Sequence, residues 1–293
     1  GAAILRAVGD SKRPLYYLIV CSVVNIILDL LLILVIPLGV LGAAIATLIA
    51  QAVSAVLVTV TLMYRTEGMK LCLSQIRMYK RMLQSILKIG LPAGFEAIMY
   101  SISNIIVQVS INNFGVDTMA AWTAYSKIDF IFWMINSAFG ISVMTFVGQN
   151  YGAGKWDRIR RGTKICLGMA LISAVFVSII LMSAERFLFG IFGNDAGVVE
   201  IGIHMMNVIA PAYLLFAFIE VFSGALRAQG AVVVSTLITM VGICVLRMIW
   251  VTLVAAHGTL EQVIICYPIT WAAGALAMSI YYIYKQRKIF QAR

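Results

Sequence analysis

Long apolar runs limit most strongly what this chain can fold into. Eight runs bounded by turn residues or charges cover most of it: 15–36, 40–64, 89–114, 118–147, 165–184, 201–226, 232–256 and 262–284. About 20 apolar residues in an α-helix cross the hydrocarbon core of a bilayer. Hydrophobic residues make up 62% of the sequence, against roughly 45–50% in soluble domains. We therefore expect an all-α polytopic membrane protein with the lipid bilayer as its main partner.

The basic residues predict how these helices are oriented. The chain has a formal net charge of +10, and most of its Lys and Arg residues fall in every second loop. The alternate loops hold only Arg186. Basic loops stay in the cytoplasm, so both ends of this chain are expected there, in a multi-pass protein of the plasma membrane. We interpret the positive charge as a topological signal and therefore expect no nucleic-acid partner. We also expect the protein to be a monomer.

A short motif occurs twice. Residues 1–9 read G-A-A-I-L-R-A-V-G and residues 222–230 read F-S-G-A-L-R-A-Q-G, sharing L-R-A-x-G. Two apolar runs and a basic exit follow each copy, which indicates an internal repeat of the kind found in transporters. The unit that contains the second copy has six apolar runs. The unit that contains the first copy has only the two runs that follow the motif. We therefore expect roughly 140 further residues before this segment in a protein of roughly 430 residues.

Several motifs resemble those of one transporter family. They are L-R-A-V-G-D-S-K-R-P (5–14), N-I-I-L-D (25–29), P-L-G-V-L-G-A-A-I-A-T (37–47), G-L-P-A-G-F-E (90–96) and G-Q-N-Y-G-A-G-K-W-D-R-I-R-R-G (148–162). With them the chain resembles multidrug and toxic compound extrusion (MATE) transporters over nearly its whole length. The same superfamily contains flippases for lipid-linked oligosaccharides, which leaves an alternative function open.

The resemblance implies two pseudo-symmetric six-helix lobes, the N-terminal one incomplete here. Residues 1–64 would be the last part of the N-terminal transmembrane lobe. Residues 65–88 would form a cytoplasmic amphipathic linker, and residues 89–293 the C-terminal six-helix lobe. The implied function is secondary active efflux of drug-like or cationic organic compounds by antiport with Na⁺ or H⁺. Beyond that coupling ion we expect no cofactor, and the sequence contains no catalytic constellation that would make the protein an enzyme.

The first candidate ion site lies in the run 15–36. Asn25 and Asp29 are four residues apart and share one helix face. A carboxyl at membrane depth costs roughly 2.5–3.5 kcal/mol on insertion scales, so it usually marks an ion or proton site. The resemblance adds Thr47 from the next helix, and makes Asp29 a metal ligand if Na⁺ is the ion. Alternatively, Asp29 caps a neighbouring helix or lines water, and Thr47 bonds to its own helix.

A second set of candidates lies in the later runs. Glu96 follows Pro92 by four residues, and Asn104 and Gln108 continue its polar stripe along the helix. A proline kink frees a backbone carbonyl and favours a polar pocket at this point. We expect the stripe to face a cavity.

Four further ionisable residues need partners within the membrane. Lys127 and Asp129 are two residues apart and point to different faces. We expect Lys127 either to contact Glu96 or to extend to the membrane interface. Glu220 lies near the cytoplasmic end of its run and is either a site residue or interfacial. Arg247 lies in mid-run, so we expect it to meet Glu220, Asp129 or another carboxyl, or to lock two helices together.

Overall fold

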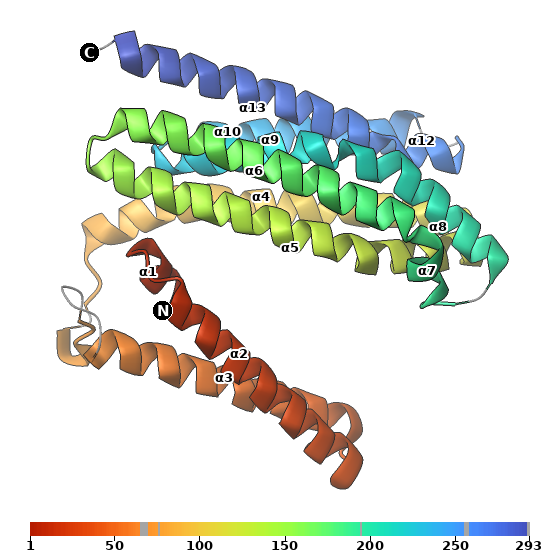
Figure 1. The fold of residues 1–293 in the computed structure, drawn as a ribbon, viewed down its shortest axis with the longest axis horizontal. Coiled ribbons are helices and arrows are strands. Elements are labelled where there is room, and N and C mark those ends of the chain that lie inside the picture. Colours follow the sequence, from red (N-terminus) through yellow and green to blue (C-terminus); the bar gives the residue numbers. More distant parts are fainter. Residues whose placement is uncertain (65–69, 76, 194, 255–257, 292–293) are drawn as a thin grey trace. The chain divides into compact units, whose positions relative to one another are not determined.

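The structure is a computed structural model that describes residues 1–64, 70–75, 77–193, 195–254 and 258–291 (Figure 1). Within these ranges the chain is helical apart from short turns and loops, and eight stretches of helix are long and apolar enough to cross a membrane. The predicted all-α polytopic class is therefore confirmed. The chain divides into two compact units, Gly1–Lys80 and Arg81–Arg293.

The first unit is a helical hairpin with a short leading helix. In chain order it contains α1 (Ala2–Ala7), α2 (Lys12–Asp29), the π-helix η1 (Leu30–Val35), α3 (Gly39–Tyr64) and the 3-10 turn η2 (Leu73–Gln75). The helices α2 and α3 pack together along their lengths. A Cβ atom on Gly42 would lie 2.9 Å from the carbonyl oxygen of Leu32, so the glycine allows η1 to approach α3 closely.

The linker predicted at 65–88 is only partly described. Residues 65–69 and 76 lie outside the described residues. The long helix α4 begins at Lys80 and therefore includes the last part of the predicted linker. The role of the segment as a cytoplasmic amphipathic linker stays a prediction.

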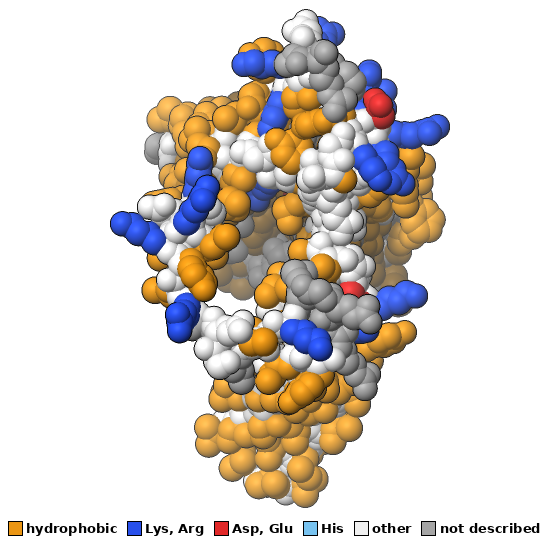
Figure 2. Space-filling view, turned by 90° about the vertical axis from the view of Figure 1, so that its left-hand side faces the viewer, with side chains coloured by type: hydrophobic (Ala, Val, Ile, Leu, Met, Phe, Trp, Pro, Cys, Tyr) orange, Lys and Arg blue, Asp and Glu red, His pale blue; other side chains and the backbone are white. Residues whose placement is uncertain are grey.

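The second unit is a bundle of long helices. Its helices are α4 (Lys80–Asn112), α5 (Val116–Gly152), α6 (Trp156–Ser183), α7 (Glu185–Gly190), α8 (Ala196–Ile209), η3 (Ala210–Ala212), α9 (Tyr213–Ala228), α10 (Val232–Thr239), η4 (Met240–Val245), α11 (Leu246–Ile249), η5 (Trp250–Val254), α12 (Leu260–Ile264) and α13 (Cys266–Gln291). The central helix is α9, which packs against α5, α6, α10 and α13. The turn between α5 and α6 and the C-terminal end of α13 lie at the same end of this unit (Figure 1). The face in Figure 2 shows many Lys and Arg side chains and few acidic ones.

The repeated L-R-A-x-G motif has the same backbone geometry in both copies. Gly9 and Gly230 have φ angles of 90° and 80°. Residue 10 donates its backbone N–H to the carbonyl of Leu5 at 3.0 Å, and residue 231 donates to Leu226 at 2.9 Å. This is the Schellman ending of a helix, in which glycine adopts the left-handed conformation. Leu5 and Leu226 are both fully buried, at 0% exposure. The internal repeat is thus visible in the structure of both copies.

Two glycines let α5 and α9 pack closely. A Cβ atom added to Gly224 of α9 would lie 2.8 Å from the carbonyl oxygen of Gly140 in α5 and 2.9 Å from a methyl group of Val143. The backbone oxygen cannot move without shifting the helix that carries it. In a membrane the hydrophobic effect does not drive helices together, and small residues at their interfaces allow close van der Waals packing that stabilises the contact.

We expect Gly224→Ala to destabilise the second unit by about 1–3 kcal/mol, because the new methyl group forces the two helices apart. Gly168→Ala is the matched control, since a Cβ there meets nothing within 4 Å. Thermal unfolding of the two variants in detergent measures the difference. Equal melting temperatures would show that the contact between α5 and α9 tolerates the extra atom.

Candidate functional site

Asn25 and Asp29 lie on α2 at the point where its hydrogen-bonding pattern changes. Asp29 is the last residue of α2, and the π-helix η1 begins at Leu30. Both side chains are half-buried. Within the described residues, Asn25 Nδ2 and Asp29 Oδ1 are shielded from solvent and have no hydrogen-bond partner. Short π-helical segments occur often at functional sites. A carboxylate oxygen that no protein donor satisfies is suited to receive a proton or a cation.

Thr47 is on the neighbouring helix α3. Its hydroxyl donates a hydrogen bond to the carbonyl of Ala43 at 2.9 Å, and its side chain is exposed. This is the alternative in which threonine bonds to its own helix. The hydroxyl oxygen still has lone pairs for a cation. In the described part of the chain, no group of three or more His, Cys, Asp and Glu side chains could hold a metal ion. A common site for Asn25, Asp29 and Thr47 stays a prediction.

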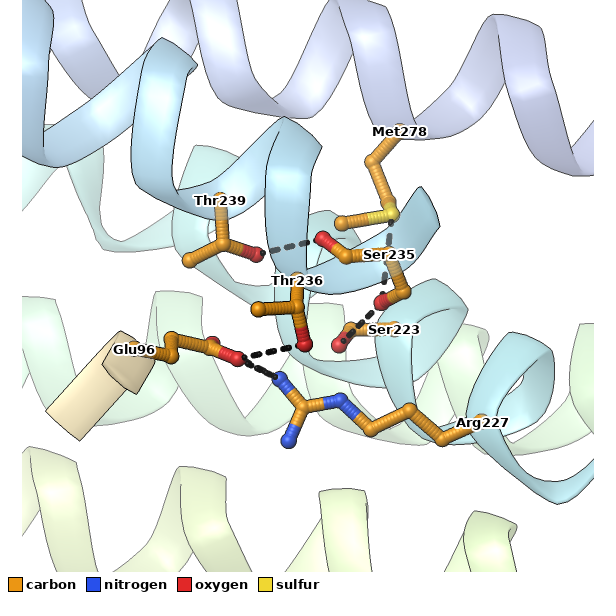
Figure 3. Close-up of polar contacts among 7 residues, drawn as sticks. All are labelled: Glu96, Ser223, Arg227, Ser235, Thr236, Thr239 and Met278. Carbon is orange, nitrogen blue, oxygen red and sulfur yellow. Dashed lines mark hydrogen bonds and ion pairs between the residues drawn. The ribbon is translucent and has the colours of Figure 1, made fainter. Parts of the chain in front are cut away.

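Glu96 is the centre of a buried polar cluster in the second unit (Figure 3). Its side chain is 11% exposed, and Arg227 Nη2 of α9 lies 2.7 Å from both of its carboxylate oxygens. Thr236 of α10 donates a third hydrogen bond at 3.0 Å. The cluster therefore joins α4 to α9 and α10.

The predicted contact between Lys127 and Glu96 is wrong. Lys127 is exposed on α5, while the carboxylate of Glu96 is occupied by Arg227 and Thr236. The ammonium group of a residue on the outer face of a helix cannot reach a carboxylate that faces the interior of the bundle.

A cavity of about 320 Å³ opens beside this cluster and is lined in part by Glu96, Glu220 and Arg227. The carboxylate of Glu220 is half-buried and lies against Gly140 of α5, in the space that a side chain there would fill. The aromatic rings of Tyr100 and Trp133 form part of the cavity wall. The cavity is thus lined by two carboxylates and one guanidinium, which together carry a net negative charge when all three are ionised.

A second cavity of about 300 Å³ collects the other polar candidates. Asn104, Gln108 and Asp129 all line it, together with an aromatic wall of Trp122, Tyr125, Phe130, Trp133, Tyr267 and Trp271. Asp129 accepts hydrogen bonds from Trp133 Nε1 and Tyr213 Oη, both at 2.5 Å. Gln108 donates to Asn112 at 2.8 Å. The faces of aromatic rings and a carboxylate held in place by hydrogen bonds are suited to bind a hydrophobic organic cation.

Arg247 is buried without a carboxylate partner among the described residues. Its guanidinium lies 3.4 Å from Asn104 Oδ1 and 3.4 Å from Thr270 Oγ1, and its Cζ is 4.1 Å from the ring centre of Tyr267. The predicted ion pair with Glu220 or Asp129 is therefore wrong. Amide and hydroxyl oxygens and a ring face stabilise the cation instead. Arg247 joins α11 to α4 and α13, which agrees with the alternative prediction that it holds helices together.

Arg227, Thr236 and Tyr213 carry these contacts and were not predicted from the sequence. The signal for Arg227 was present, because it belongs to the repeated L-R-A-x-G motif at the end of an apolar run. Tyr213 and Thr236 carry no such signal, since hydroxyls in apolar helices usually bond to their own backbone.

Comparison with known proteins identifies the family. A sequence profile of the MatE family matches residues 92–253, which is more than half of the chain. The chain belongs to the MATE family. It is 28% identical over 298 residues to the probable multidrug resistance protein YoeA of Bacillus subtilis (strain 168), covering 97% of this chain. It is 24% identical over 264 residues to the multidrug export protein MepA of Staphylococcus saprophyticus, covering 85% of this chain.

Solved structures of the family share the fold. One, described as the outward-facing conformation of a multidrug resistance MATE family transporter of the MOP superfamily, superposes with a TM-score of 0.90 at 20% identity over 98% of this chain. Another, a MATE in the bent conformation, gives a TM-score of 0.88 at 19% identity over 99% of this chain. The chain spans 64% of the length of YoeA and 65% of both structures.

Family membership confirms two further expectations. MATE proteins are transporters and not enzymes, and the eight candidate spans make this chain part of a multi-pass membrane protein. The lipid bilayer is accordingly its environment.

Proposed function

We propose that the protein containing this chain is a secondary active exporter of drug-like or cationic organic compounds in the plasma membrane. Na⁺ or H⁺ acting at Asp29 would drive it by alternating access, with both ends of this chain in the cytoplasm. The observation that carries the proposal is a buried, unpartnered carboxylate oxygen at the junction of α2 and η1 in a chain of the MATE family.

The chemistry of the site supports coupling. Asp29 can be neutralised by a proton or by a cation, and Asn25 offers a second oxygen one helical turn away. An ion changes the balance between two conformations only through its different affinity for each of them. A carboxylate that is desolvated more in one conformation than in the other provides such a difference, because desolvation disfavours its charged form.

The cavities of the second unit support the choice of cargo. Both contain carboxylates, and both have aromatic walls. Positive charge on an organic compound would be balanced by Glu220 or Asp129, while its rings pack against Trp133, which lines both cavities. The relatives named as multidrug resistance or multidrug export proteins favour this cargo over the lipid-linked oligosaccharide of the alternative flippase.

The test is ethidium efflux from cells that lack their own pumps and express the full-length protein. We expect efflux to depend on an external ion, and separate variation of Na⁺ and pH identifies which. Absence of efflux under every condition, with the protein present in the membrane, would contradict the proposed function.

A further inference from the structure

A basic hollow lies between α6 and α13, away from the cavities described above. Both helices pack against α9. Between their ends opens a hollow of about 320 Å³, lined by Arg160, Lys164, Tyr282, Ile283, Gln286 and Arg287. Arg160 and Lys164 are one turn apart on α6, and Arg287 approaches from α13. These three cations face one space, and no described residue among its lining carries a carboxylate.

The floor of the hollow is a fixed polar surface. Tyr282 is 7% exposed, and its ring stacks on Phe222 of α9 with the ring centres 4.5 Å apart. Its hydroxyl is shielded from solvent and lies beside the Thr163 side chain of α6. Gln286 is held in place by a hydrogen bond of 3.0 Å from its Nε2 to Gln229 Oε1. Three cations around a buried hydroxyl form an arrangement that an oxyanion completes.

An apolar strip on α13 leads away from the hollow. Its exposed side chains are Leu276, Ile280 and Ile283. Ile283 belongs to both the apolar strip and the hollow. A free anion would use only the basic end, whereas a lipid with an anionic headgroup would use the basic end and the apolar strip together.

We propose that the hollow between α6 and α13 binds the headgroup of an anionic phospholipid. The phosphate oxygens would accept hydrogen bonds from Arg160, Lys164 and Arg287, and the Tyr282 hydroxyl would donate to one of them. The acyl chains would lie along the apolar strip. By the positive-inside rule these helix ends face the cytoplasm, where the leaflet carries anionic lipids that attract Lys and Arg.

The expected strength follows from the charges. Each basic residue near an anionic headgroup contributes about fivefold in affinity, so losing all three should weaken binding by roughly 100-fold. The lipid would also bridge two helices that are held together through α9. Bound lipid should therefore raise the thermal stability of the second unit, because it binds the folded form alone.

The test compares lipids on the purified full-length protein. Melting temperatures are measured in detergent with phosphatidylglycerol, with phosphatidylcholine or with inorganic phosphate, and native mass spectrometry counts bound lipids. We expect phosphatidylglycerol to raise the melting temperature by several degrees, with no such rise from phosphatidylcholine or phosphate. The combined variant Arg160→Gln, Lys164→Gln and Arg287→Gln should lose that rise and one tightly bound lipid.

The control removes three charges elsewhere, with Lys80→Gln, Arg81→Gln and Lys88→Gln on α4, and should keep the full effect. Should the first variant fail to purify, Arg287→Gln alone should weaken phosphatidylglycerol binding about fivefold in the same mass spectra. The proposal is overturned if phosphate stabilises as well as phosphatidylglycerol, or if the hollow variants bind the lipid as tightly as the unchanged protein.

Discussion

Asp29→Asn should strongly reduce ion-driven export while leaving substrate exchange intact. In proteoliposomes with an imposed Na⁺ or pH gradient, we expect accumulation of ethidium to fall by about 5- to 150-fold, the usual range for coupling between two sites. The amide keeps the size and one oxygen of the side chain, but it can neither release a proton nor balance a cation. Exchange of labelled for unlabelled substrate without a gradient needs no ion and should continue.

Asp157→Asn is the matched control for Asp29→Asn. Asp157 is an exposed carboxylate in the first turn of α6, and it has no place in the proposed site. The same amide substitution there should leave accumulation unchanged. Loss of both exchange and accumulation in Asp29→Asn would point to a folding defect, and unchanged accumulation would move the coupling site to Glu96 or Glu220.

Glu96→Ala is expected to destabilise the second unit by about 3 kcal/mol, because it leaves the Arg227 guanidinium without its anion in a largely buried place. The Arg227 side chain is 27% exposed, and some solvation therefore remains to limit the loss. Thermal or denaturant unfolding in detergent measures the change.

Two comparisons test whether the pair, and not the carboxylate alone, is responsible. Combining Glu96→Gln with Arg227→Gln should recover much of the stability, since two neutral amides can bond to each other and no charge is left unpaired. Lys127→Met tests the rejected partner and should change stability by less than about 0.5 kcal/mol, as expected for an exposed position. A large effect of Lys127→Met together with a small effect of Glu96→Ala would contradict the observed pairing.

The local features of this chain could be predicted, whereas its long-range contacts could not. Apolar runs predicted the spans because in a bilayer each helix must satisfy its own backbone hydrogen bonds. The L-R-A-x-G motif predicted an internal repeat, and the left-handed conformation of Gly9 and Gly230 follows from the residue type. The continuity of α4 from Lys80 into the following apolar run was not predicted, because a basic amphipathic stretch can either continue a helix or lie on a membrane.

The wrong ion pairs have one physical origin. From the sequence, Glu96 and Arg247 were each expected to have a charged partner in an adjacent or central run. Glu96 instead meets Arg227, which is 131 residues away in the chain. Arg247 uses the ring of Tyr267 and two neutral oxygens. Which helix face turns toward which neighbour depends on packing of the whole bundle, and aromatic rings are partners that a search for opposite charges overlooks.

The most direct test of the central claim measures the coupling ion itself. Full-length protein is reconstituted in vesicles without a gradient, and a pulse of ethidium is added outside while internal pH and Na⁺ are recorded with fluorescent indicators. We expect substrate entry to drive H⁺ or Na⁺ out of the vesicles, and Asp29→Asn to take up substrate without moving either ion. Ion movement of the same size in Asp29→Asn would contradict this expectation.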